Sequence, residues 1–290
     1  MANTIIKTNM RSLNSHRNMK ASSVHQARSS QRLASGLRLN SAADDAAGMG
    51  ISEKMRSQVR SLDQATRNCQ DAISLIQTAD GALGTINDMA VRIRELMIQA
   101  ANDTNNYNEE NPDWSDRARI QDEIDQLLDE IDNVALRSEF NSMKLLDGSF
   151  GSAAGDGLWF QIGAMSGHGV HATIEGMDTE TLDLRNPALT VMLPSGEIIS
   201  REILRLDSAL AHVNMERGSL GAVQNRLEHA IENLEVASEN LSEANSRIAD
   251  ADMAKEIMVL TQANVSQEAA QAMKAQANQA PQNILQLLAP

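Results

Sequence analysis

The sequence predicts a mainly α-helical fold. We expect a long antiparallel, coiled-coil-like rod that pairs the N- and C-terminal parts of the chain and carries a small β-rich insertion. Two series of apolar residues, each with a period of seven, lie near opposite ends of the chain, and such a repeat favours long helices packed along a seam. The first series is Met55, Leu62, Cys69, Ile76, Leu83, Ala90 and Met97. The second series is Leu206, Val213, Leu220, Leu227, Leu234, Leu241 and Ile248.

The aromatic content supports the same fold. Only 2% of the residues are aromatic, and all of them lie in the middle of the chain. They are Tyr107, Trp114, Phe140, Phe150, Trp159 and Phe160. The two ends therefore cannot build a core around large rings, and they must pack narrow seams of aliphatic side chains, as coiled coils do.

We divide the chain into five segments, and the first is residues 1–40. Met10, Leu13 and Val24 keep an approximate three/four spacing there, but the apolar face is too narrow for a helix that is stable alone. Gly36 is a candidate helix C-cap. We therefore expect a weakly amphipathic helix that orders on a partner.

The second segment, residues 41–139, contains the N-terminal rod helices. It opens with a bend of small residues, in which Asp44 or Asp45 caps the next helix. A long helix then covers about 51–101, and a shorter helix folds back antiparallel after a polar loop. The second seam position of the long helix is occupied by Ala65, Ala72, Ala79, Ile86, Ile93 and Ala100. The stripe of the shorter helix is Ile120, Ile124, Leu127, Ile131 and Val134.

The remaining segments are a small β-rich region at 140–200, a C-terminal rod helix at 201–252 and a final helix at 253–290. Glycines punctuate the β-rich region, which predicts short strands at 158–162 and 171–175 and a hairpin of 190–193 with 197–200. The apolar phase slips at 249–252, which indicates a joint. Beyond it the apolar residues are Met253, Ile257, Leu260, Ile284, Leu287 and Leu288.

Composition excludes several classes of function. The net charge of −14 argues against binding to nucleic acid, although residues 1–60 hold ten Lys or Arg against three acidic residues. No stretch has the length and apolarity of a membrane span, and residues 1–11 lack the apolar core of a cleavable secretory signal. Cys69 is the single cysteine and is expected to be a core residue.

No pattern of catalytic or cofactor-binding residues emerges. The glycines match neither nucleotide fingerprint, the serines lack a nucleophile elbow, and no zincin motif occurs. His168 and His171 have no suitable third metal ligand nearby. We therefore expect neither an enzyme nor a cofactor-binding protein.

Several segments together resemble the bacterial flagellins. Residues 32–48 (RLASGLRLNSAADDAAG) are similar to the N-terminal hallmark of that family, and 77–83 (QTADGAL), 92–96 (RIREL) and 139–141 (EFN) continue the likeness in order. Residues 276–288 (QANQAPQNILQLL) resemble the flagellin C-terminus. The likeness covers about 1–147 and 201–290, and the short middle resembles that of a minimal flagellin.

The resemblance implies a subunit that polymerises with copies of itself into the extracellular flagellar filament, without cofactors, after export through the flagellar type III channel. Residues 1–40 and 253–290 would then be inner-tube helices. Their polymerisation seams would be Met10, Leu13, Val24, Met253, Ile257, Leu260, Ile284, Leu287 and Leu288. The bend at Gly36, Asp44, Asp45 and Gly48 would be a spoke between the inner and outer parts.

The resemblance also implies partners. These are an export chaperone at the C-terminal segment, the filament cap and the hook–filament junction proteins. Toll-like receptor 5 senses many flagellins, and the matching positions here are Arg92, Leu96 and Glu123. Arg92 and Glu123 could instead form a surface ion pair only. Two alternative functions stay open: a junction protein present in few copies, and an acidic coiled-coil adhesin or immune ligand.

Overall fold

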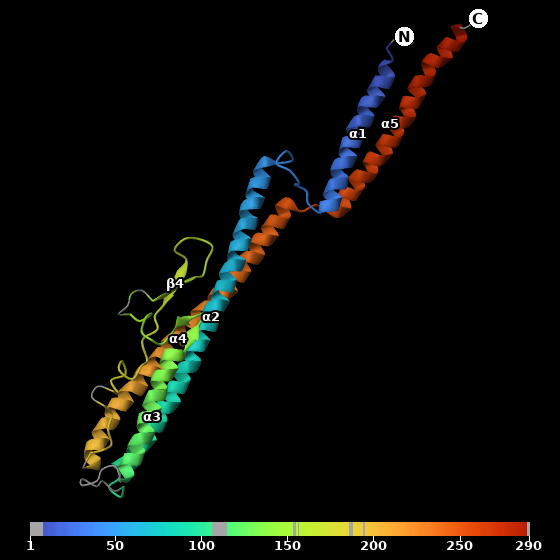
Figure 1. The fold of residues 1–290 in the computed structure, drawn as a ribbon. Helices are drawn as coiled ribbons and strands as arrows, with labels where there is room; N and C mark the ends of the chain where they lie inside the picture. The colour runs from blue at the N-terminus through green and yellow to red at the C-terminus, as the bar shows by residue number, and fades with distance from the viewer. Residues whose placement is uncertain are drawn as a thin grey trace. The chain divides into compact units, whose positions relative to one another are not determined.

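The computed structural model describes residues 8–105, 115–152, 155, 157–185, 188–193 and 195–288, with side chains up to residue 279. The chain packs as two units. One comprises Met1–Val59 with Glu239–Pro290, and the other comprises Arg60–Ser238. The predicted helical class is confirmed, and the helices can be followed along the chain in Figure 1. They are α1 (Met10–Ser35), α2 (Ala46–Ala101), α3 (Asp116–Arg137), α4 (Gly196–Ala249) and α5 (Met253–Leu288).

The predicted heptad seams form the core of the second unit. From Leu62 to Met97 every residue of the first series is buried, and so is every member of the second seam position of α2. In α4 the series is buried from Leu206 to Leu234. Cys69 is fully buried, and desolvation raises the pKa of its thiol, as expected of a core cysteine.

Polar contacts show that α2 and α4 run antiparallel in this unit. As the residue number increases along α2, the residue number of its contact on α4 decreases. The contacts are Asp63 with Ser238 (3.0 Å), Asp80 with Arg217 (2.8 Å), Asn87 with Asn214 (3.3 Å) and Arg94 with Asp207 (2.8 Å). The predicted antiparallel pairing of the two rod helices is therefore present here.

The stripe of α3 differs in part from its prediction. Ile120, Ile124 and Ile131 are buried as expected, but Leu128 and Ala135 are buried in place of Leu127 and Val134, which are half-buried. An α-helix has 3.6 residues per turn, and a seven-residue repeat does not match this period. The buried face can therefore move from one position to the next along the helix. Ser115 caps α3 by accepting a hydrogen bond from the Ala118 amide.

In the described part of the chain, the named strands form two antiparallel hairpins. They are formed by β1 (Glu139–Phe140) with β2 (Met143–Lys144), and by β3 (Leu158–Gln161) with β4 (Gly169–Ala172). Asn141 and Ser142 form the turn of the first hairpin at φ 50° and 65°, the left-handed conformation that a two-residue turn requires. The prediction of a strand near 158–162 is confirmed. That at 171–175 is only partly correct, because β4 ends at Ala172 and Ile174 forms an isolated bridge with Phe150.

The predicted hairpin at 190–200 is wrong. Residues 197–200 belong to α4, whose first turn is capped by Ser195, and Pro194 of the predicted turn lies outside the described residues. Gln121 of α3 binds the backbone of the preceding segment: it donates to the Leu189 carbonyl (3.1 Å) and accepts from the Val191 amide (2.7 Å). A side chain thus satisfies backbone groups that a partner strand would have bound.

The insertion is fixed to α3 by charge. Asp132 accepts hydrogen bonds from the Thr179 amide (2.8 Å) and hydroxyl (2.9 Å) and an ion pair from Arg185 (2.6 Å), which also reaches Asp129 (3.1 Å). Part of the acidic surface of α3 therefore holds the insertion. In the described residues, no helix is both long enough and apolar enough to span a membrane.

Candidate functional site

Helices α1 and α5 lie side by side in the first unit (Figure 1). They run antiparallel, because Asn9, the N-cap of α1, donates to the Ala277 carbonyl (2.7 Å) while Arg32, near its other end, lies 3.9 Å from Glu256. Helix α1 ends at Gly36, which adopts φ 71° as the predicted C-cap. This pair contains the predicted polymerisation seams.

The two helices face each other through small and polar side chains. On α1 the half-buried or buried residues follow a three/four spacing: Ser12, Ser15, Met19, Ser22, Gln26, Ser29 and Leu33. On α5 the matching series is Glu256, Leu260, Ala263, Gln267, Ala270, Lys274 and Ala277. Among the described side chains of both helices, only Ser29, Ala263 and Ala270 are buried. The contact between α1 and α5 therefore buries very little apolar surface.

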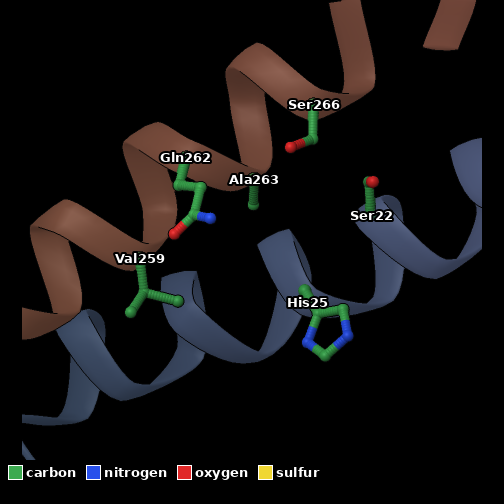
Figure 2. A pocket seen from close by; sticks show the side chains of 6 residues that line it. All are labelled: Ser22, His25, Val259, Gln262, Ala263 and Ser266. Carbon is green, nitrogen blue, oxygen red and sulfur yellow. The ribbon is translucent and has the colours of Figure 1, made fainter. Parts of the chain in front are cut away.

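A hollow between the helices reflects these small side chains. It has a volume of about 240 Å³ and is lined by Ser22, His25, Val259, Gln262, Ala263 and Ser266. Figure 2 shows Ala263 projecting from α5 toward α1, with Ser22 and Ser266 on one side of it and Val259 on the other. The methyl and hydroxymethyl groups are too short to fill the space, so the helices do not interdigitate as a packed core would.

Most of the predicted polymerisation seam points away from this contact. Met10, Leu13 and Val24 of α1, and Met253 and Ile257 of α5, are exposed, and only Leu260 is half-buried. The side chains of Ile284, Leu287 and Leu288 lie outside the described residues. The sequence thus identified the apolar residues of α1 but missed the face that meets α5, because a stripe of serines gives no hydrophobic signal.

Helix α5 has a second apolar surface that the sequence analysis did not identify. Met258, Val265 and Met273 are 65%, 60% and 63% exposed, and Ala269 and Ala272 lie between them on sides of the helix that do not face α1. Between 253 and 279 the charged residues are Lys255, Glu256, Glu268 and Lys274 alone. A helix that is apolar on several sides is typical of one that is surrounded by protein.

The predicted bend forms a small, well-bonded junction. The chain entering it pairs with the joint between α4 and α5: the Arg38 amide donates to the Ala249 carbonyl (2.7 Å) and the Ala251 amide to the Gly36 carbonyl (2.9 Å). The phase slip at 249–252 thus corresponds to a true helix break, after which the Asp252 side chain caps α5 through the Ala254 amide (3.0 Å).

The two aspartates of the bend, Asp44 and Asp45, bind different backbone amides. Asp45 accepts hydrogen bonds from the Ala47 and Gly48 amides, both at 3.0 Å, and caps α2. Asp44 closes the preceding turn by accepting from the Asn40 and Ser41 amides, and the bond from Asn40 lowers the pKa of its carboxyl. A Cβ at Gly48 would lie 2.5 Å from an Asp45 oxygen, so a side chain there would displace the capping carboxylate.

The candidate receptor residues are divided between surface and core. Arg92 and Glu123 are exposed and form an ion pair from α2 to α3 at 2.8 Å, and this hydrogen bond raises the pKa of Arg92. Arg92 also binds Glu95 at 3.1 Å. Leu96 is 2% exposed and packs in the core. The structure therefore places Arg92 and Glu123 together on the surface and Leu96 beneath it.

Comparison with known proteins gives two family matches. The bacterial flagellin N-terminal helical region matches residues 6–151, and the bacterial flagellin C-terminal helical region matches residues 203–288. Together they cover well over half of the chain. The chain belongs to the bacterial flagellin family. The unmatched interval, 152–202, contains β3 and β4 of the insertion.

Individual flagellins align along nearly the whole chain. The flagellin of Halalkalibacterium halodurans is 45% identical over 98% of this chain and 99% of its own length. That of Bacillus subtilis is 41% identical, with the same two coverages. The crystal structure of Bacillus cereus flagellin is 34% identical, covers 58% of this chain and 88% of its own, and superposes with a TM-score of 0.46. As a flagellin, the chain is a structural protein of the flagellar filament and not an enzyme.

Proposed function

We propose that this flagellin is exported through the flagellar type III apparatus and polymerises outside the cell, with α1 and α5 buried against copies of themselves. The observation that carries the proposal is the direction of the apolar side chains. The two helices meet largely through serine, alanine and glutamine, with Met19, Leu33 and Leu260 half-buried among them, and they expose Met10, Leu13, Val24, Met253, Ile257, Met258, Val265 and Met273 to solvent. Stacking of copies would remove these side chains from water.

Each subunit would have to contact several copies to bury its exposed apolar side chains. Burying a large apolar side chain contributes roughly 1.5–3 kcal/mol, and the exposed set on α1 and α5 spans several sides of the pair. One two-fold contact would cover one side only. Interfaces that are repeated head to tail and do not close generate helical filaments, and they can cover several sides of each subunit.

The exposed apolar surface of α5 also fits the proposed partners. Before assembly, a chaperone bound to 253–290 would shield the same side chains and prevent premature polymerisation. The filament cap and the hook–filament junction proteins would bind subunits at the two ends of the polymer. A chain that formed only the junction would be a minor component of sheared filaments, whereas the proposed subunit is their main component.

The test is a charge placed on the second apolar surface of α5. Val265→Lys changes a side chain that is 60% exposed, so the monomer should keep its helix content and its unfolding transition. We expect salted-out protein to form no filaments visible by electron microscopy. Met165→Lys, at an exposed position in the loop between β3 and β4, is the matched control and should polymerise. Normal filaments from Val265→Lys, or from a chain that lacks 253–290, would contradict the proposal.

A second proposed role is binding to Toll-like receptor 5. The exposed Arg92–Glu123 pair supports this role, because its charges are available to a partner on the outer side of α2 and α3. Leu96 would support the surface from beneath without direct contact, since it is buried. An exposed pair contributes only about 0–1 kcal/mol to folding, so substituting it should leave the fold intact.

A receptor assay on the monomer separates this role from an ion pair that is only structural. Arg92→Ala and Glu123→Ala should each reduce receptor activation. Arg94→Ala, which breaks the neighbouring ion pair of α2 with Asp207 of α4, is the matched control and should not. Equal activation by all three variants would contradict the receptor role and leave the filament proposal unaffected.

A further inference from the structure

Helix α5 contains methionines whose side chains are largely exposed to solvent. Met258 and Met273 on α5 are 65% and 63% exposed. Residues three and four positions away are their neighbours on the helix surface, and these are alanine, glutamine, threonine or the flexible Lys255. These neighbours leave both methionine side chains largely in contact with water. By contrast, Met97 and Met177 of the second unit are fully buried.

We infer that Met258 and Met273 are oxidation sites through which hydroperoxides control assembly of the free subunit. In this reaction the thioether sulfur attacks one oxygen of hydrogen peroxide, the O–O bond breaks, an S=O bond forms and water leaves. The sulfur loses two electrons and the peroxide gains them. The product is methionine sulfoxide, a polar and chiral side chain in place of a flexible apolar one.

The consequence follows from the position of the two side chains. Both lie on the second apolar surface of α5, so the inference rests on the proposed burial of that surface in the filament. A sulfoxide oxygen buried there without a donor destabilises the contact, because a desolvated polar group is unfavourable unless it is hydrogen-bonded. The monomer would tolerate the same change, since both side chains are already in water.

Assembly would in turn protect the sulfur atoms. A subunit is sensitive while it is free and becomes insensitive once neighbours cover α5. The modification is also reversible, because methionine sulfoxide reductases return each sulfoxide to the thioether while two thiols become a disulfide and water leaves. Oxidation of Met258 and Met273 would therefore control the assembly of free subunits reversibly.

The experiment compares peroxide treatment before and after polymerisation. Peptide mass spectrometry of the treated monomer should show sulfoxide at 258 and 273 but not at 97 or 177, and in treated filaments 258 and 273 should be spared. The oxidised monomer should need about a tenfold higher concentration to polymerise, a change equivalent to about 1.4 kcal/mol. Reduction by methionine sulfoxide reductases A and B together should restore polymerisation.

Matched variants assign the effect to these two residues. Met258→Leu with Met273→Leu keeps the side-chain volume, so this chain should polymerise. Its polymerisation should be less sensitive to peroxide than that of the wild type, with the remaining sensitivity due to the exposed seam residues Met10 and Met253. Met165→Leu removes an exposed methionine of the insertion and should stay sensitive. If the double variant cannot polymerise at all, the reductase treatment of the wild-type chain decides.

Three results would overturn the inference. The first is polymerisation of the oxidised wild-type chain at the same concentration as the untreated chain. The second is full sensitivity of the double variant to peroxide. The third is a failure of reduction to restore assembly. A wild-type chain that does not polymerise before oxidation would instead contradict the proposed function, and this inference with it. The untreated sample therefore distinguishes the two failures.

Discussion

At the scale of single residues, the junction between the helices depends on side chains that bind backbone amides. Asp44 and Asp45 are adjacent in sequence, yet one closes a turn and the other caps α2. Gly48 leaves room for the second bond. The sequence could predict that an aspartate caps α2, since caps have a known composition. It could not assign the two roles, which depend on where the turn at 40–44 closes.

Asp44 gives the junction a pH dependence. Its folded-state pKa lies below the ordinary value of 3.8, so its contribution to stability is complete above that value and is lost as the pH falls through the folded pKa. Asp44→Asn should therefore lower the melting temperature at neutral pH. The difference between the wild type and the variant should shrink in acid, as measured by circular dichroism. A constant difference over the acid range would contradict this role of the carboxylate.

Leu227 tests the seam of α4. It is fully buried, so Leu227→Ala should lower the free energy of unfolding by about 2–5 kcal/mol, measured by urea denaturation. Leu204→Ala in the same helix is the matched control, because Leu204 is 67% exposed and its loss should change stability by less than about 0.5 kcal/mol. Equal effects of the two substitutions would contradict the assignment of the buried face.

At the scale of whole elements, the predictions succeeded where apolar side chains do the packing. The heptads of α2 and α4 were read correctly because Leu, Ile and Ala occupy the buried positions. The contact face of α1 was missed because Ser22 and Ser29 carry no apolar signal. The hairpin at 190–200 was mispredicted because Gln121, distant in sequence, binds that backbone. Such a contact depends on the tertiary fold and leaves no local pattern.

The long helix α2 contains a glycine, Gly81, that could be replaced by a residue of higher helix propensity. Gly81 lies inside the helix, and a Cβ added there would have no atom within 4 Å. Gly81→Ala should therefore stabilise the chain by up to about 1 kcal/mol, because alanine has the higher helix propensity and the unfolded chain loses freedom. The check is the midpoint of urea unfolding. A shift of the midpoint to lower urea would contradict this prediction.

At the scale of the whole molecule, the chain combines two units with different internal packing. The unit of residues 60–238 has a continuous core of aliphatic side chains along α2, α3 and α4. The unit that contains α1 and α5 has few buried residues in those helices and many exposed apolar ones. Stability is not uniform across such a chain, and the thinly packed helices should open first. The domain limits predicted at 40 and 253 remain predictions, since the two units divide within α2 and α4.

Hydrogen exchange of the α5 amides, measured on the purified monomer and again on assembled filaments, tests the central claim most directly. The account predicts rapid exchange throughout α5 in the monomer, slow exchange in the core of α2 in both states, and strong protection of α5 only after polymerisation. If the α5 amides of the monomer were already as protected as those of α2, and assembly changed nothing, copies would not be needed to bury this helix and the account would be wrong.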